Sequence, residues 1–279
     1  MTVLFGLAAA ILYGVGDFAG AFASRLRSSS LAVLAYAYPV GAVLMTVLLP
    51  FFPGHLTARA ALFGLLGGVA GLVGVFVMYS LMTVAPMNVI SPVTAVLAAI
   101  VPVVFGVLIG ERPQLAAWIG IALGLVGVVL VSRTTEDHPH GRVAPRILLL
   151  ACLSGLGFGG YFIFLGHAGP GTGIWPLVVS RVTSALLVVP WAFAKQLVRP
   201  LLRGRVLAIA LIAGICDATA NMCYVLATHA GLLSLASVLT SLYPAVTVIL
   251  AVALLHEHTS RVQRVGLVLA GVAVVLITV

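Results

Sequence analysis

The sequence contains very little charge. Only 7% of its 279 residues are Asp, Glu, Lys or Arg, and only six are acidic, whereas 62% are hydrophobic. A soluble domain carries about 25% charged residues, so most of this protein's surface is too apolar to face water. We therefore expect an all-α integral membrane protein, with lipid as the solvent for most of its outer side chains.

Several motifs for other functions are also missing. The three cysteines, Cys152, Cys216 and Cys223, lie in apolar segments and form no Cys-x-x-Cys pair, which argues against a disulfide framework. The ATP-binding pattern Gly-x4-Gly-Lys-Ser/Thr does not occur. The histidines at 136–140 and 256–258 lack the i, i+4 spacing that puts two ligands on one helical face. We therefore predict no metal and no cofactor.

Long apolar runs dominate what is present. A bilayer core about 30 Å thick needs about 20 apolar residues per helix, and hydropathy with loop punctuation places ten such runs in the chain. The first has no basic segment before it, so we interpret it as a retained span and not as a signal peptide. The runs lie near residues 2–22, 30–50, 61–82, 86–109, 115–132, 147–167, 173–193, 205–228, 231–254 and 262–279.

The runs form two related halves, residues 1–132 and 147–279, joined by the polar loop 133–146. Matching positions are offset by 145 residues, or by 146 after one insertion. The pairs are Tyr13-Gly14 with Phe158-Gly159, Tyr79 with Tyr224, and Glu111 with Glu257. Five spans in each half would insert the second half upside down relative to the first. Inverted repeats are typical of secondary transporters, which bind their solute near the midplane, so we predict two inverted five-helix repeats around a central cavity.

Both halves end in a similar motif. In the second half Glu257 follows Pro244 by thirteen residues and precedes a glycine-punctuated last helix; in the first half Glu111 stands in Gly-Glu-Arg. The first-half proline is displaced, with Ala98 at the equivalent position and Pro102 one turn later. These features resemble EamA repeats of the drug/metabolite transporter superfamily over nearly the whole chain. The resemblance implies a ten-helix carrier, not an enzyme, that moves small metabolites or drugs by alternating access.

Three charged residues fall inside the predicted spans and away from their ends: Asp17, Arg181 and Asp217. Each costs about 2.5 to 3.5 kcal/mol at a helix centre on insertion scales, so all three are functional candidates. Arg181 and Asp217 lie at similar depths and can pair. That pair is either purely structural, or Arg181 orients an anionic group while an aspartate carries the coupling proton. For Asp17 the alternatives are a transport role and a structural contact with polar loops or headgroups.

Polar side chains are also spaced to share helical faces. Asp217, Asn221 and Tyr224 follow i, i+4, i+7 on one face of a predicted helix. We expect such faces to line a cavity suited to an amphipathic solute. The predicted substrate-binding or coupling residues are Asp17, Tyr13, Tyr79, Arg181, Asp217, Asn221, Tyr224, Ser237 and Ser241.

Two alternatives remain open beside export of a small metabolite or drug-like solute, with or without proton coupling. A flippase for a lipid or lipid-linked molecule would use the same fold. Gly-Val-Gly-Asp at 14–17 resembles an active-site motif of intramembrane aspartyl proteases, which need two aspartates that share a proton. The second would be Asp217, but the remaining protease signatures are missing or misplaced: the nearest match to Pro-Ala-Leu is Pro244-Ala245-Val246.

The basic residues predict orientation and location. We number each connection by the span that precedes it. Eleven of the fourteen Lys and Arg residues lie in odd-numbered connections, namely those after spans 1, 5, 7 and 9. The even-numbered connections hold two, Arg59 and Arg112. The positive-inside rule thus places both termini outside the cytoplasm, whereas the family resemblance implies termini inside; we give the charge count more weight. We expect a multi-pass protein of the bacterial plasma membrane, monomeric or homodimeric. Its partners would be a small solute and membrane lipids, and not nucleic acid.

Overall fold

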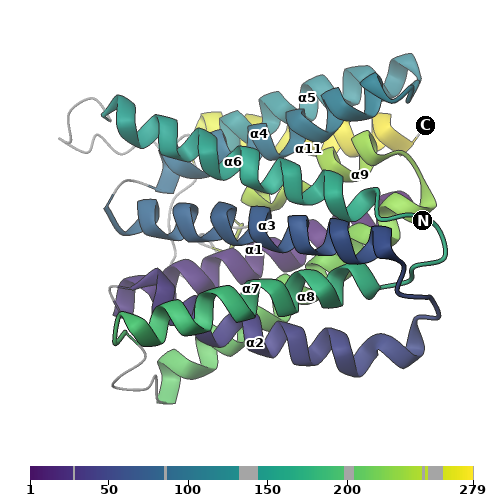
Figure 1. Ribbon diagram of the computed structural model, residues 1–279. Helices are drawn as coiled ribbons and strands as arrows, with labels where there is room; N and C mark the ends of the chain where they lie inside the picture. Colours follow the sequence, from purple (N-terminus) through teal and green to yellow (C-terminus); the bar gives the residue numbers. More distant parts are fainter. Residues whose placement is uncertain are drawn as a thin grey trace.

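The computed structural model describes residues 1–27, 29–84, 87–131, 144–197, 204–246, 249–250 and 260–278. Every regular element in these ranges is a helix (Figure 1). In chain order they are α1 (Thr2–Arg27), α2 (Ser30–Leu48), the short 3-10 helix η1 (Leu49–Phe51), α3 (Ala58–Val84), α4 (Met87–Leu108), α5 (Leu115–Val131), α6 (Pro145–Gly166), α7 (Trp175–Ala194), α8 (Gly204–Ala230), α9 (Leu233–Thr240) and α11 (Arg261–Thr278).

Each of the ten predicted runs contains a described helix, so the all-helical fold is confirmed. Within the described residues, six helical segments are long and apolar enough to cross a membrane; ten crossings stay a prediction. The six are Thr2–Ser24, Ser30–Phe51, Ala58–Val84, Pro145–Gly166, Trp175–Ala194 and Gly204–Ala230. Three shorter apolar helices, of 10–17 residues, lie at Val93–Leu108, Leu115–Leu130 and Leu233–Val246. Most of the polar loop 133–146 and Glu257 lie outside the described residues.

Local sequence explains several helix boundaries. The Ser29 side chain accepts a hydrogen bond from the Ala32 amide at 3.2 Å and starts α2, and Thr57 caps α3 in the same way. Helix α9 ends at Thr240, so the predicted run at 231–254 is interrupted there, and residues 243–246 are helical again. Pro244 has no N–H to donate to the Thr240 carbonyl, so a regular helix cannot pass through this point unchanged.

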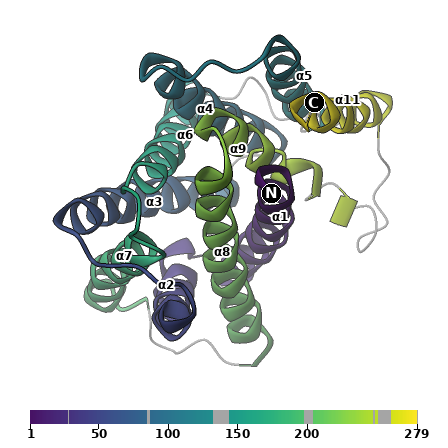
Figure 2. The ribbon, with the colours of Figure 1, turned by 90° about the vertical axis from the view of Figure 1, so that its right-hand side faces the viewer.

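The helices of one half pack mainly on helices of the other. Helix α1 lies on α8, α3 on α6 and α7, α2 on α7 and α8, α4 on α6 and α9, and α5 on α11. Under the offset of 145, α1 corresponds to α6 and α3 to α8, so the α1–α8 contact has its equivalent in α6–α3. The pair α5 and α11 lies at one corner of the bundle, away from α2 and α7 (Figure 2).

Glycines allow helix α3 to approach its two neighbours closely. A Cβ on Gly68 would lie 2.6 Å from the Ser180 carbonyl oxygen of α7, so only glycine fits at this crossing. The Ser184 hydroxyl of α7 donates to the Gly68 carbonyl at 2.8 Å. On the α6 side, the Ser154 hydroxyl donates to the Gly74 carbonyl at 2.8 Å. Helix α3 is therefore fastened to two helices from the second half.

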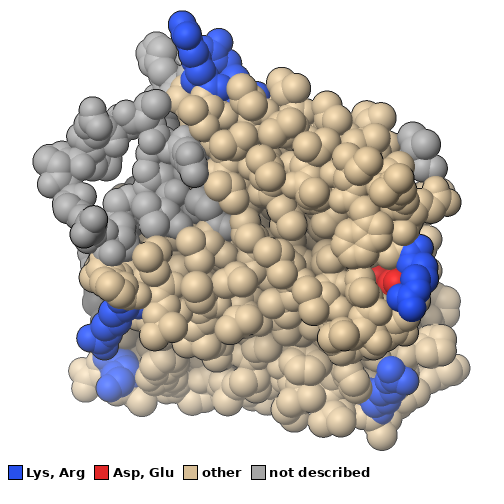
Figure 3. Space-filling view, turned by 90° about the horizontal axis from the view of Figure 1, so that it is seen from above, with Lys and Arg blue, Asp and Glu red and all other residues tan. Residues whose placement is uncertain are grey.

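The exposed charged side chains lie toward the margins of the face seen in Figure 3. Seen from above, the surface is free of charged side chains over most of its area, and the few Lys and Arg lie toward its edges (Figure 3). This distribution matches a bundle whose long sides contact lipid.

Candidate functional site

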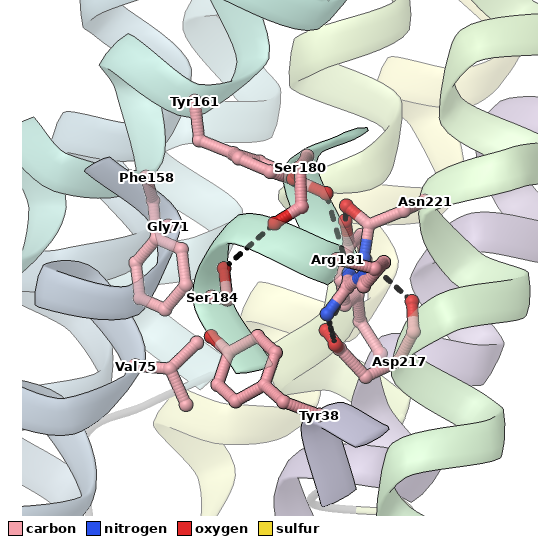
Figure 4. A pocket seen from close by; sticks show the side chains of 11 residues that line it. Tyr38, Gly71, Val75, Phe158, Tyr161, Ser180, Arg181, Ser184, Asp217 and Asn221 are labelled. Atoms are coloured by element: carbon pink, nitrogen blue, oxygen red, sulfur yellow. Dashed lines mark hydrogen bonds and ion pairs between the residues drawn. The ribbon is translucent and has the colours of Figure 1, made fainter. Parts of the chain in front are cut away.

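Arg181 and Asp217 meet in the interior, as predicted. The Arg181 Nη1 atom of α7 forms an ion pair with Oδ2 of Asp217 on α8 (Figure 4). Its Nη2 donates to the Tyr161 hydroxyl of α6 at 3.2 Å, and the guanidinium carbon lies 5.4 Å from the centre of the Tyr38 ring of α2. The arginine is only 4% exposed, and its Nε has no hydrogen-bond partner among the described residues.

Asn221 extends this network toward the first helix. One turn after Asp217, its Nδ2 donates to the Asp217 backbone carbonyl at 2.6 Å and lies 3.3 Å from the Asp217 carboxylate. Its Oδ1 accepts a hydrogen bond from the Tyr13 hydroxyl of α1. A continuous polar chain thus runs from α6 and α7 through α8 to α1, and it joins the two halves at the centre of the bundle.

An aromatic group borders this polar chain. The Tyr13 ring lies 6.1 Å from Phe162 and 6.4 Å from Tyr243, measured between ring centres. Phe162 in turn stacks on Tyr224 at 4.4 Å. The Tyr224 hydroxyl donates to the Phe162 carbonyl and lies 3.1 Å from the Ser237 hydroxyl. Tyr224 and Ser237 therefore hold Phe162 in place and do not line the cavity beside Arg181.

Asp17 lies beside the network with a partner of its own. Its carboxylate accepts a hydrogen bond from the Tyr79 hydroxyl of α3, and it is near enough to Asp217 for the two charges to interact. Gly20 makes room for the Tyr79 hydroxyl, and Gly16 lies against Cys216 of α8. Asp17 is thus held by protein, in contrast to the contact with loops or headgroups that we considered from sequence.

The space inside the site is small. A cavity of about 20 Å³ lies beside the ion pair, which is enough for about one water molecule. A second cavity of about 10 Å³ also contacts Tyr38 and Asp217 and reaches Tyr79. The larger one is lined by Tyr13, Tyr38, Gly71, Val75, Phe158, Tyr161, Ser180, Arg181, Ser184, Asp217 and Asn221. Any solute larger than water therefore needs the helices to move apart.

The structure brings most of the predicted residues together, but not all. Ser241 is buried, and its hydroxyl has no partner among the described residues; it is outside the polar chain. Sequence reasoning missed Tyr38 and Tyr161, which hold the guanidinium. Their signal was present, because a phenol inside an apolar run needs a hydrogen-bond or cation partner.

Glu111 was also missed. It follows Gly110, whose φ of 101° ends α4 in the left-handed region. The Glu111 carboxylate then accepts hydrogen bonds from the backbone amides of Leu233 at 2.7 Å and Ser234 at 3.1 Å. From sequence we used it only to match the two halves, through Glu257 and the Gly-Glu-Arg motif. It also caps the start of α9 and ties the first half to the second.

Comparison with known proteins agrees with this architecture. No curated protein matches the chain significantly. One solved structure, described only as the crystal structure of a protein, has a TM-score of 0.74 at 19% identity and covers 99% of this chain and 95% of its own, which shows a shared fold. The family model of the EamA-like transporter family matches twice, at residues 1–133 and 145–279. The chain therefore belongs to the EamA-like transporter family, and it is a multi-pass membrane protein.

Proposed function

We propose that the protein is a secondary transporter that exports a small amphipathic metabolite or drug-like solute from a bacterial cell. In this proposal ten spans form two inverted five-helix repeats, and the site between them opens alternately to the two sides. One observation carries the proposal: a buried ion pair lies where the halves meet, with Tyr13 and Tyr38 from the first half and Tyr161 from the second around it. Following the charge count, the odd-numbered connections face the cytoplasm.

The ion pair suits solute exchange because its members can be separated only if each gains another partner. An anionic group of the solute can replace Asp217 at Arg181, where the guanidinium offers bidentate hydrogen bonds. The released Asp217 then needs a proton or a cationic group, since an unpaired buried charge is costly. Asp17 is a second carboxylate near the same site. Solute binding and proton binding are therefore coupled through charge balance.

The partners of the two aspartates give the protease alternative no support. An aspartyl protease needs two carboxylates that share a proton and activate water between them. Here Asp217 is paired with Arg181, and Asp17 is hydrogen-bonded to Tyr79. A flippase remains the alternative cargo class, since it would use the same fold and the same site.

Flux into proteoliposomes tests the transport proposal. With a pH gradient imposed, we expect uptake of at least one member of a panel of amino acids and amphipathic cations, and Asp217→Asn should abolish its dependence on the gradient. Thr219→Val is the matched control, because Thr219 lies on the same helix and only bonds its own Ile215 carbonyl. No flux with the whole panel would contradict the proposal.

The same vesicles distinguish the alternatives. Translocation of a fluorescent phospholipid in place of soluble solutes would identify a flippase. Cleavage of a transmembrane peptide that is lost in both Asp17→Ala and Asp217→Ala would instead identify a protease. Normal solute flux in those two variants would rule out the transport roles assigned to the aspartates.

A further inference from the structure

A much larger cavity lies at the ends of α2, α3 and α7, outside the central site. Its volume is about 360 Å³. The ends of α3 and α7 that form it are on the side of the bundle opposite the chain termini (Figure 1). Its lining includes Ser30, Phe76, Ser80, Thr83, Trp191 and Lys195. Neither the central network nor the transport proposal uses any of these residues.

One end of this cavity is polar. The hydroxyls of Ser30 and Ser80 are 2.9 Å apart, and Thr83 donates to the Ser80 carbonyl at 2.7 Å. Lys195 follows the last residue of α7 and is exposed; its ammonium has no carboxylate partner among the described residues. The Ser80 hydroxyl already donates to the Phe76 carbonyl at 2.6 Å, so the exposed Lys195 ammonium is the group that can attract a phosphate.

The other end is apolar and faces outward. The Trp191 and Phe76 rings are 4.8 Å apart, and Trp191 is 40% exposed. One turn back toward the middle of each helix, Leu187 of α7 and Val73 of α3 are also exposed. Because α3 packs along α7, these side chains extend the cavity into an apolar strip toward the bilayer core. Tryptophan is enriched at the headgroup level of membranes, so we infer that the cavity lies at the depth of the lipid headgroups.

We propose that this cavity binds an anionic phospholipid, with its phosphate beside Lys195 and an acyl chain along the strip from Trp191 to Leu187. A soluble anion would use only the polar end. The apolar strip, which continues from the cavity on the lipid-facing side of a candidate membrane span, is the reason for choosing a lipid. The proposal is independent of which solute the protein carries.

Tryptophan quenching by brominated lipids tests this site directly. The purified protein is reconstituted in phosphatidylcholine with a small fraction of brominated phosphatidylglycerol or brominated phosphatidylcholine. The contribution of Trp191 is the difference from Trp191→Phe, because Trp118 and Trp175 remain in both proteins. We expect brominated phosphatidylglycerol to quench this contribution at a lower fraction than brominated phosphatidylcholine.

Two charge variants distinguish a specific lipid site at Lys195 from a general attraction of anionic lipid to the basic residues of the surface. Lys195→Gln should reduce the preference for the anionic lipid about fivefold. Arg205→Gln is the matched control, since Arg205 is an exposed basic residue that does not line the cavity, and it should leave the preference unchanged. Equal quenching by both lipids, or equal losses in the two variants, would overturn the proposal. Reversal of the quenching by inorganic phosphate would show a free-anion site and would also overturn it.

Discussion

Two equivalent pairs of residues in the two halves do different things. Asp17 and Tyr79 of the first half correspond, at the offset of 145, to Phe162 and Tyr224 of the second. The first pair forms a hydrogen bond between a carboxylate and a phenol. The second forms an aromatic stack at 4.4 Å, with the tyrosine bonded to backbone. Equivalent positions thus hold an ionisable carboxylate, Asp17, in the first half and a packed apolar ring, Phe162, in the second half.

The ion pair shows the same asymmetry. The positions equivalent to Arg181 and Asp217 are Tyr36 and Leu72 in the first half. The second half therefore supplies both charges of the pair, and the first half supplies phenols that surround it. The comparison teaches that the two halves share an architecture, whereas the chemistry of the site depends on where they differ.

The largest effect is expected when the pair is broken on one side only. Arg181→Met leaves Asp217 buried without its partner, which should lower the free energy of unfolding by about 3 to 5 kcal/mol and abolish flux. The double variant Arg181→Met/Asp217→Leu makes this position apolar, as Leu72 is in the first half. It should recover most of the stability, since apolar replacements of buried pairs are often neutral.

Thermal unfolding in detergent measures the stability of these two variants, and flux in vesicles measures their transport activity. The double variant should remain inactive although it is stable. If it transports normally, the ion pair has only a structural role and the proposed site is wrong.

A smaller loss of stability is expected when Glu111 of the first half no longer caps α9 of the second half. Glu111→Ala removes the acceptor for the Leu233 and Ser234 amides, which should lower stability by about 2 kcal/mol. Glu111→Gln keeps one acceptor oxygen and should lose less. Hydrogen exchange of those two amides should quicken in the alanine variant, and unchanged exchange would refute the capping role.

Removing the two equivalent tyrosine hydroxyls sharpens the comparison further. Tyr224→Phe loses its bonds to the Phe162 carbonyl and to Ser237, so stability should fall by about 1 kcal/mol with flux largely kept. Tyr79→Phe removes the partner of Asp17 and should alter the pH dependence of flux. Identical pH profiles for the two variants would mean that the difference between the halves has no functional consequence.

The smallest change in stability is expected for Asp17→Asn. The amide can still accept a hydrogen bond from Tyr79, so unfolding should change by less than about 1 kcal/mol. An amide cannot bind a proton as a carboxylate does, so flux should no longer respond to the pH gradient. Gradient-driven flux equal to that of the unaltered protein would exclude Asp17 as the coupling group.

The sequence predicted the helices and the central pair for clear physical reasons. Apolar runs of bilayer length indicate helices, and two opposite charges at similar depth can pair, as Arg181 and Asp217 do. It did not predict that Tyr161 holds the arginine or that Glu111 reaches α9. Those contacts depend on how distant helices are placed side by side, and no local pattern specifies that. The early end of α9 could have been predicted from Pro244.

The fastening of α3 has a mechanical consequence. Serines on α6 and α7 bond to its backbone carbonyls at Gly74 and Gly68, so these three helices form one stiff body although they come from both repeats. In the transport proposal, a unit that moves would therefore combine helices of both repeats and would not be a single repeat. A fragment holding only the first repeat would keep α3 but lose both of its supports, and we expect it to be unable to fold alone.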